Sequence, residues 1–331
     1  MSKRGESGRT KLPIVISQGE PSGIGPEVAV KAFASLKGEI AGRRLRLIGD
    51  KDVFRQAAEC CNIDASVFDG AVIETAHRAR AQPGKPSTET AKSVTDAIAD
   101  GVRACQSGEA AALVTAPIHK AVLLSAGFGF PGHTEFLAAL TRAPRAVMML
   151  ASRGLSPPLR VVPFTVHMPL KDVFDQLSAE AIAHTGDIVL EALKKDFGCS
   201  QPRLAVAGLN PHAGEDGTMG REDMEIIAPA IDLLRKRGHA VSGPLSADTL
   251  FHDEARKLYD AALCMYHDQA LIPIKTLAFW TGVNVTLGLP IVRTSPDHGT
   301  ALSLAGHGVA NAQSMIAAVE MAAEIADRRG L

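Results

Sequence analysis

Residues 261–269 read Ala-Ala-Leu-Cys-Met-Tyr-His-Asp-Gln, an apolar run typical of a buried strand that ends in a histidine and an acid. The same pattern recurs at residues 161–167 (VVPFTVH) and 204–212 (LAVAGLNPH). Ligands of open α/β sheets bind outside the carboxyl ends of the strands. We therefore predict that the three histidines converge on one metal ion, with a coordination position left open for substrate. They are His167, His212 and His267. The competing interpretation is that each is an ordinary loop residue.

The composition is that of an α/β protein. With 331 residues, the chain is long enough for two domains, or for one large unit with an insertion. Apolar residues make up 46% and aromatic residues only 4%, so alanine, valine and leucine fill the core, as suits parallel strands covered by helices. The formal net charge is −1 with both signs mixed along the chain, which argues against a nucleic-acid partner.

The sequence also predicts a cytoplasmic location. Five cysteines are scattered without a Cys-x-x-Cys pair, which favours free thiols in a reducing compartment. The first eleven residues are polar and basic, with no apolar segment of a secretory signal behind them. No apolar run reaches the roughly 18 residues of a membrane span. We expect a soluble protein without a membrane partner.

Strands and helices alternate along the chain. The glycine-rich loop at residues 18–27 follows the first predicted strand, but Val28 stands where the dinucleotide fingerprint requires its last glycine, so the loop is interpreted as a tight turn. Residues 128–132 (FGFPG) indicate a domain crossing. Next come His133 and Thr134, with Thr134 as the predicted N-cap of a helix whose start could bind an anion. Strands are predicted at 12–17, 45–49 and 111–115, and helices at 51–60, 87–105, 178–197 and 222–236.

Taken together, several motifs resemble the 4-hydroxythreonine-4-phosphate dehydrogenase family of pyridoxal phosphate biosynthesis. Residues 296–311 are also similar to the adenosine-binding loop of isopropylmalate and isocitrate dehydrogenases. The resemblance spans almost the whole chain. The matching stretches are 19–28 (GEPSGIGPEV), 117–120 with 132–136 (GHTEF), 209–214 (LNPHAG), 243–251 (GPLSADTLF), 266–275 (YHDQALIPIK) and 284–300.

The resemblance implies a two-domain α/β/α fold of the isocitrate/isopropylmalate dehydrogenase type, with an interdomain cleft and without a GxGxxG Rossmann domain. The first domain would comprise residues 11–130 and about 280–331, including the dinucleotide loop. The second, about 131–279, would carry the metal histidines and the dimer contacts. The resemblance further implies a homodimer whose active sites lie at the subunit interface.

The resemblance also assigns roles to residues of this chain. The metal ligands that the resemblance implies are again His167, His212 and His267, so this second line of inference agrees with the strand pattern. Imidazole ligands favour one zinc ion per subunit, with cobalt or magnesium as alternatives. The dinucleotide would be NAD or NADP. Substrate-binding residues implied by the family are His133, Thr134, Lys275, Asn284 and Arg293, and dinucleotide-binding residues are His298, Gly299, Thr300 and Asn311.

The implied reaction oxidises the C3 hydroxyl of 4-phosphohydroxy-L-threonine, and the resulting β-keto acid then loses carbon dioxide. Three residues could accept the hydroxyl proton: Asp248, Asp268 and Lys275. The sequence does not choose among them. Lys275 and Arg293 suit the phosphate and carboxylate of the substrate, against the alternative that both are ordinary surface charges.

Other functions stay open at this point. The substrate could be another phosphorylated hydroxy acid of the erythronate or threonate 4-phosphate type. The three histidines could instead activate water in a hydrolase, which would leave the loop at residues 296–311 without a purpose. A catalytically silent binding protein would bind no metal.

Overall fold

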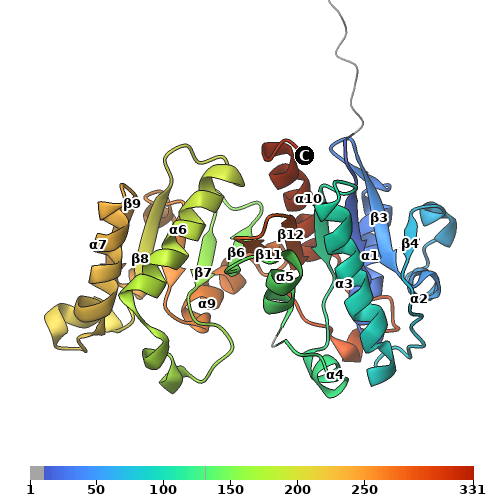
Figure 1. Cartoon of the computed structure of the whole chain (residues 1–331), viewed down its shortest axis with the longest axis horizontal. Helices are drawn as coiled ribbons and strands as arrows, with labels where there is room; N and C mark the ends of the chain where they lie inside the picture. Colours follow the sequence, from blue (N-terminus) through green and yellow to red (C-terminus); the bar gives the residue numbers. More distant parts are fainter. Residues whose placement is uncertain (1–10, 131) are drawn as a thin grey trace, which may run out of the picture. The chain divides into compact units, whose positions relative to one another are not determined.

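The computed structural model describes residues 11–130 and 132–331 and divides the chain into two compact units (Figure 1). Unit 1 contains residues 11–129, 299–312 and 330–331. Unit 2 contains residues 130–298 and 313–329. The segment on which the prediction about a secretory signal rests is mostly residues 1–10, and these lie outside the described residues, as does Pro131 of the predicted linker.

Unit 1 is built on a small, mainly parallel sheet. Strand β1 (Ile14–Ser17) is fully buried and pairs in parallel with β3 (Arg43–Gly49) on one side and β5 (Ala112–Thr115) on the other. The short β4 (Val72–Glu74) adds in parallel to β3, and β2 (Glu39–Ile40) turns back on it. The helices of this unit are α1 (Gly25–Ser35), α2 (Lys51–Cys60), α3 (Ala91–Gln106) and α4 (Lys120–Ser125).

Unit 2 has a mixed sheet in the order β12-β11-β6-β7-β10-β8-β9. Strands β7, β10, β8 and β9 run parallel to one another, whereas β6, β11 and β12 pair antiparallel with their neighbours. The strands are β6 (Val147–Ser152), β7 (Arg160–Pro163), β8 (Arg203–Ala207), β9 (Ala240–Leu245), β10 (Ala261–Cys264), β11 (Gly282–Leu287) and β12 (Val292–Pro296).

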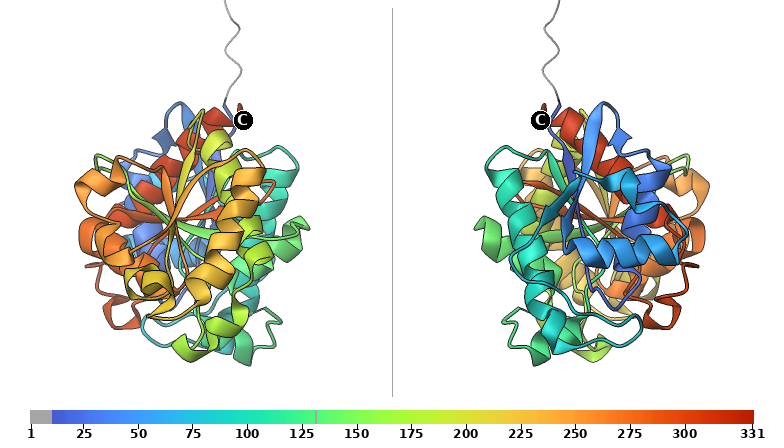
Figure 2. Two further views of the ribbon diagram at one scale, coloured as in Figure 1. Left: turned by 90° about the vertical axis from the view of Figure 1, so that its left-hand side faces the viewer. Right: turned by 90° about the vertical axis from the view of Figure 1, so that its right-hand side faces the viewer.

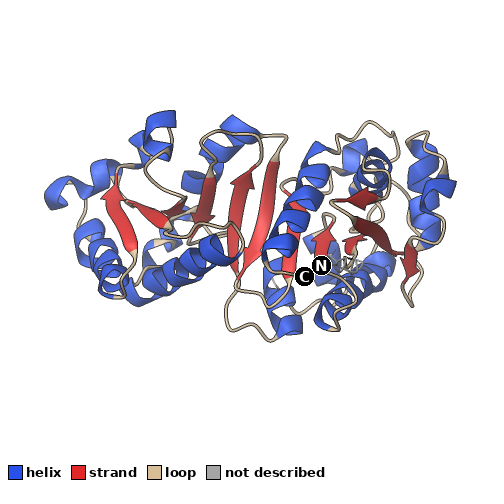
Figure 3. Cartoon of the chain, turned by 90° about the horizontal axis from the view of Figure 1, so that it is seen from above, coloured by secondary structure: helices blue, strands red, loops and turns tan. Residues whose placement is uncertain are grey.

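Helices cover both faces of this second sheet (Figure 3). In the left view of Figure 2, the gold helix α7 runs along the outside of the strands of unit 2. The helices are α5 (His133–Thr141), α6 (Ala179–Lys195), α7 (Ala228–Lys236), α8 (Asp253–Arg256), α9 (His267–Ala278) and α10 (Gln313–Arg328).

Helix α9 is fixed by an apolar stripe. Ala270, Ile274 and Ala278 follow one another at four-residue steps, so they share one helix face. That face packs into a buried cluster with Leu150, Val161 and other residues from four strands of unit 2. A fully buried Ile or Leu side chain contributes about 1.5–3 kcal/mol, so this contact holds α9 firmly against the face of the sheet.

The local predictions agree with the structure in most places. The helix predicted at 51–60 has those bounds, and the strand predicted at 45–49 lies within β3. The helix predicted at 222–236 is irregular, because a π-helical turn over Asp223–Ile227 precedes α7, which carries Pro229 in its first turn. The domain division differs from the expected one after residue 279. Strands β11 and β12 and helix α10 group with unit 2, because β11 pairs with β6 and α10 packs on β12.

Among residues 11–130 and 132–331, no helix combines the length and the apolar character needed to span a bilayer.

Candidate active site on unit 2

The three strands that precede the histidines are neighbours. Strand β10 lies between β7 and β8 and is parallel to both, so their carboxyl ends meet at one edge of the sheet. His167, His212 and His267 each follow the end of one of these strands within a few residues. The arrangement predicted from the sequence, a histidine delivered by each of three parallel strands, is therefore present in the fold.

His167 and His267 face one another at this edge. Backbone hydrogen bonds continue beyond β7 and β10, from the N–H of Phe164 to the carbonyl of Cys264 (2.8 Å) and from Thr165 to Met265 (3.2 Å). The hydroxyl of Thr165 also donates to the Met265 carbonyl at 2.8 Å. These contacts bring the imidazole rings of His167 and His267 to a centroid separation of 5.7 Å.

The ring of His267 is also oriented. Its Nδ1 lies 2.7 Å from Oδ1 of Asp268, the acid that follows it. A carboxylate on one ring nitrogen fixes the tautomer and leaves Nε2 as the acceptor, the arrangement found behind metal-binding histidines. Asp268 thus acts on His267 directly, and its own side chain is exposed.

A buried amide connects the two strand ends that carry His267 and His212. Gln269 is 8% exposed. Its Oε1 accepts the N–H of Met265 at 2.7 Å, and its Nε2 donates to the carbonyl of Gly208 at 2.7 Å. The amide therefore fixes the start of α9 relative to the loop that leads to His212.

The loop that carries His212 has an unusual backbone. Residues 212–216 all have positive φ, including the non-glycine His212 at 53° and Glu215 at 41°. Buried Asp223 holds the loop at its start, where it accepts the N–H groups of Leu209 (2.7 Å) and Asn210 (3.1 Å). Left-handed backbone at consecutive non-glycine residues is strained and clusters at functional sites.

Asp248 is the acid that interacts electrostatically with His212. A hydrogen bond from the Ser246 hydroxyl, 2.6 Å from Oδ1 of Asp248, lowers the pKa of this carboxyl, and His212 lowers it further by charge interaction. Asp248 is exposed at the loop after β9.

The described residues contain no group of three or more His, Cys, Asp or Glu side chains close enough together to hold a metal ion. The structure brings His167 and His267 together, and His212 interacts electrostatically with Asp248. The joining of His212 to the other two histidines stays a prediction.

Arg293 on β12 is a buried cation. Its side chain belongs to a residue that is 2% exposed, and burial lowers its pKa to about 9. Its Nη1 donates to the hydroxyl of Thr286 at 2.8 Å, and its Nη2 lies 3.3 Å from Nδ1 of His133. The guanidinium is thus a buried positive charge that faces the first residue of α5.

Two further predicted substrate residues also belong to unit 2. Asn284 lies on β11, two residues before Thr286 and on the same face of the strand, and its Oδ1 is buried without a hydrogen-bond partner among the described residues. Lys275 on α9 forms an ion pair with Asp297, with 2.8 Å between Nζ and Oδ2. Burial raises the pKa of Asp297, and the Lys275 ammonium opposes that rise.

The start of α5 differs from the prediction at one residue. Helix α5 begins at His133 with Gly132 as its N-cap, so Thr134 lies inside the first turn and does not cap the helix. The cause is Gly132, whose extended backbone leads directly into the helix. His133 and Thr134 nevertheless remain at the amino end of α5, where unpaired N–H groups favour an anion.

The predicted dinucleotide residues are divided between the units. His298 is the last residue of unit 2 before the segment 299–312, which belongs to unit 1 and includes Gly299, Thr300 and the exposed Asn311. In unit 1 the carbonyl of Thr300 accepts the N–H of Ile24 at 2.9 Å. A Cβ on Gly23 would lie 2.8 Å from that same carbonyl oxygen, which explains a glycine there.

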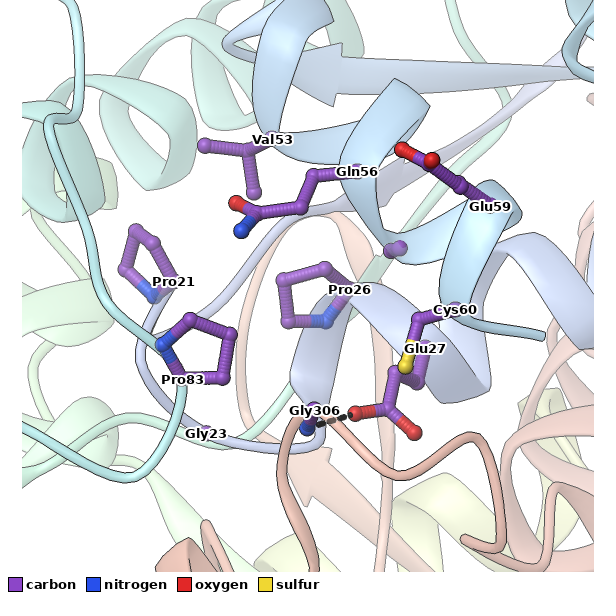
Figure 4. Close-up of a pocket in the computed structure, with 11 residues that line it drawn as sticks. Pro21, Gly23, Pro26, Glu27, Val53, Gln56, Glu59, Cys60, Pro83 and Gly306 are labelled. Atoms are coloured by element: carbon purple, nitrogen blue, oxygen red, sulfur yellow. Dashed lines mark hydrogen bonds between the residues drawn. The ribbon is translucent and has the colours of Figure 1, made fainter.

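Two charged side chains of α1 hold this loop. Buried Glu27 accepts the N–H of Gly306 through Oε1 at 2.7 Å, and Lys31 donates to the carbonyls of Gly308 and Ala310, both at 2.7 Å. Beside them is a pocket of about 220 Å³ (Figure 4). The side chains of Pro26, Glu27 and Cys60 line it, and the second carboxylate oxygen of Glu27 is buried without a hydrogen-bond partner among the described residues.

Sequence reasoning missed the residues that hold the site together. Gln269, Asp223, Thr286, Glu27 and Lys31 each act through contacts with chain segments elsewhere in the sequence. Asp297 carried a weak signal, since it stands directly before the predicted His298–Thr300 loop. Nothing in the local sequence indicated its pairing with Lys275.

Comparison with known proteins adds an independent observation. Residues 42–322 match the family described as the pyridoxal phosphate biosynthetic protein PdxA. The 4-hydroxythreonine-4-phosphate dehydrogenase of Paracoccus denitrificans is 50% identical over 323 residues, covering 96% of this chain and 98% of that protein. The enzyme of the same name from Caulobacter vibrioides is 48% identical over 338 residues, covering 97% and 100%.

Solved structures give the same picture. The crystal structure of 4-hydroxythreonine-4-phosphate dehydrogenase from Klebsiella pneumoniae superposes with a TM-score of 0.81 at 33% identity, covering 96% of this chain and all of that one. Isocitrate dehydrogenase from Methylococcus capsulatus superposes with a TM-score of 0.55 at 11% identity, which is a likeness of fold alone. The fold class expected from the sequence is confirmed.

Proposed function

The chain belongs to the family of the pyridoxal phosphate biosynthetic protein PdxA, and on that premise we propose that it oxidises 4-phosphohydroxy-L-threonine at C3 with NAD or NADP. The product, 2-amino-3-oxo-4-phosphobutanoate, is a β-keto acid and loses carbon dioxide to give 3-amino-2-oxopropyl phosphate. The observation that carries this proposal is the oriented pair of imidazoles, His167 and His267, at the ends of adjacent parallel strands.

The substrate is anionic at two ends, and unit 2 offers matching groups. Arg293 presents a buried guanidinium, which suits the two-pronged binding of phosphate or carboxylate. His133 and Thr134 at the start of α5 add N–H donors beside it. The unpaired Oδ1 of Asn284 is an acceptor for the substrate's ammonium or hydroxyl group.

The donor chemistry of the strand ends fits one divalent cation. His167, His267 and His212 would hold it, and zinc suits imidazole ligands best, with cobalt or magnesium as alternatives. When bound, such an ion acts as a Lewis acid that acidifies an alcohol. The chain's own contribution is orientation: Asp268 sets the tautomer of His267, and Gln269 fixes the two strand ends relative to each other.

The C3 hydroxyl proton must pass to a basic group of the chain. The candidates are Asp248, Asp268 and Lys275. The Ser246 hydroxyl holds the pKa of Asp248 low, so that carboxylate stays ionised at neutral pH. Asp268 is engaged by His267, and Lys275 is paired with Asp297. Removing each candidate in turn and recording the pH profile of kcat would identify the base.

The dinucleotide would supply the hydride acceptor, held by the segment that contains Gly299, Thr300 and Asn311, together with His298. What supports this assignment in unit 1 is the way α1 fixes the segment through Glu27 and Lys31. A loop fixed by its own fold loses little conformational freedom when a ligand binds.

We also propose a homodimer with the active site at the subunit interface. Helix α9 begins with His267, and large apolar side chains on and just after it are exposed: Ile272 at 63%, Phe279 at 57% and Trp280 at 54%. An apolar surface of this kind marks an interaction site. Five free cysteines support a reducing, cytoplasmic location.

The test is a reaction assay on the purified protein with a divalent metal and NAD or NADP. We expect reduced dinucleotide to accumulate with 4-phosphohydroxy-L-threonine and not with erythronate or threonate 4-phosphate. Faster reduction with a four-carbon sugar acid phosphate would reassign the substrate. Release of inorganic phosphate without reduced dinucleotide would indicate the hydrolase.

A further inference from the structure

Unit 2 contains a second pocket, of about 460 Å³, that shares no lining residue with the proposed active site. It runs along one flank of α6. The connection between α5 and β6, the turn between β11 and β12, and the residue that follows α10 complete its walls. Its volume is that of a small-molecule site.

The pocket is cationic. Four positive and two negative side chains line it, and Arg329 and Asp196 neutralise each other, which leaves three cations against one carboxylate. The positive residues are Arg142, Arg145, Lys195 and Arg329, the negative ones are Glu191 and Asp196, and His184 is the titratable residue at one end.

Arg329 is the buried member of this set. Its side chain is 8% exposed, and it binds Asp196 through two parallel hydrogen bonds of 2.7 and 2.8 Å from Nε and Nη2. The remaining nitrogen, Nη1, is buried without a hydrogen-bond partner among the described residues. Leaving a buried donor without an acceptor costs about 1–3 kcal/mol, and an acceptor that reached this nitrogen would recover that cost.

Arg145 is a second arginine in the wall of the pocket. Its guanidinium lies 5.7 Å from the centre of the Phe164 ring, and partial burial lowers its pKa. The turn at Gly288 approaches so closely that a Cβ there would lie 2.5 Å from the Arg145 carbonyl oxygen. Because Gly288 has a φ of +80°, only glycine is comfortable at this position, and the wall of the pocket is preformed.

The body of the pocket is apolar. Helix α6 presents Ile188 and Ala192 on the same face as His184 and Lys195, at helical spacing. Leu289 and Pro290 stand on the turn between β11 and β12. A ligand that fits has an anionic head for the arginines and lysine and a small apolar body for this wall.

We propose that this pocket binds a phosphate monoester with a compact apolar or aromatic body, at a site separate from the catalytic one. A dianion is favoured over a carboxylate, because three cationic residues besides the paired Arg329 line the pocket against one unpaired carboxylate, and phosphate offers three acceptor oxygens. The site goes beyond the proposed dehydrogenase reaction and does not depend on it.

The test is calorimetric titration with three probes: phenyl phosphate, inorganic phosphate and benzoate. The variant removes two charges, Arg145→Gln with Lys195→Gln, and the control is Lys194→Gln, an exposed neighbour on α6 that does not line the pocket. We expect one phenyl phosphate site per chain. Its affinity should fall by at least about tenfold in the double variant and should stay unchanged in the control. Turnover of the double variant should equal that of the parent chain.

Inorganic phosphate should bind this site more weakly than phenyl phosphate, because it leaves the apolar wall uncovered. Equal binding of benzoate would overturn the assignment to phosphate. Phenyl phosphate binding that the double variant leaves unchanged would overturn the site itself. Equal weakening in the Lys194→Gln control would show that only general surface charge attracts the probe, which also refutes the proposal.

Discussion

Replacing Gln269 with methionine should destabilise unit 2 and slow the reaction together. Methionine has nearly the same length but can neither accept the Met265 N–H nor donate to the Gly208 carbonyl, and both of those hydrogen bonds are 2.7 Å long. With the residue 8% exposed, water does not replace the lost partners. Each unsatisfied buried group costs about 1–3 kcal/mol, so we expect a loss of about 2–6 kcal/mol.

The assay is urea unfolding followed by tryptophan fluorescence. The chain has one tryptophan, Trp280, which lies in unit 2 and reports that unit directly. Gln269→Glu keeps the acceptor for Met265 but places a buried carboxylate oxygen against the Gly208 carbonyl, so at neutral pH its loss of stability should be at least as large as that of Gln269→Met. The control is Gln176→Met, an exposed residue of the same unit, with an expected change within about 0.5 kcal/mol. A Gln269→Met variant as stable and as active as the parent would refute the role of this amide.

Four further predictions concern the site. His267→Ala should abolish turnover while unit 2 stays folded, and normal activity of this variant at matched metal content would remove His267 from the ligand set. Asp268→Asn should lower the affinity for the metal by about 10–100-fold, which competition with a chelator would measure. Arg293→Ala should raise the KM for substrate by about tenfold to a hundredfold, because a charge-assisted contact contributes about 1.5–3 kcal/mol; an unchanged KM would place Arg293 outside the substrate site. Ser246→Ala should raise the pKa of Asp248, because the Ser246 hydroxyl donates a hydrogen bond that favours the Asp248 carboxylate. Carbon-detected NMR would follow the titration of Asp248, and in the variant the carboxylate should protonate at a higher pH than in the parent chain. An unchanged titration would contradict the assigned cause.

The positions of the strands and the histidines could be predicted because both are local features. An apolar run that ends in a histidine is visible at His167, His212 and His267, and the helix at 51–60 shows in its own periodicity. Parallel pairing then follows from alternating strands and helices. The sequence could not show that β10 lies between β7 and β8, which brings the histidines to one edge.

The supporting contacts escaped prediction because they depend on distant segments. Gln269 reads as one more polar residue in a helix, and only the fold shows that it reaches Gly208, 61 residues earlier. For Arg293 the sequence left a substrate-binding role and a surface charge open, and only the fold shows that the residue is 2% exposed. The grouping of β11, β12 and α10 with unit 2 was missed for the same reason, since pairing with β6 joins segments more than a hundred residues apart.

The proposal to test most directly is that His167, His212 and His267 bind one divalent ion. X-ray absorption at the metal edge of zinc-loaded protein measures this directly, because imidazole rings give characteristic outer-shell scattering. We expect three imidazole ligands per zinc, falling to two in a His212→Ala variant. A spectrum with one imidazole or none, or one that His212→Ala leaves unchanged, would contradict it.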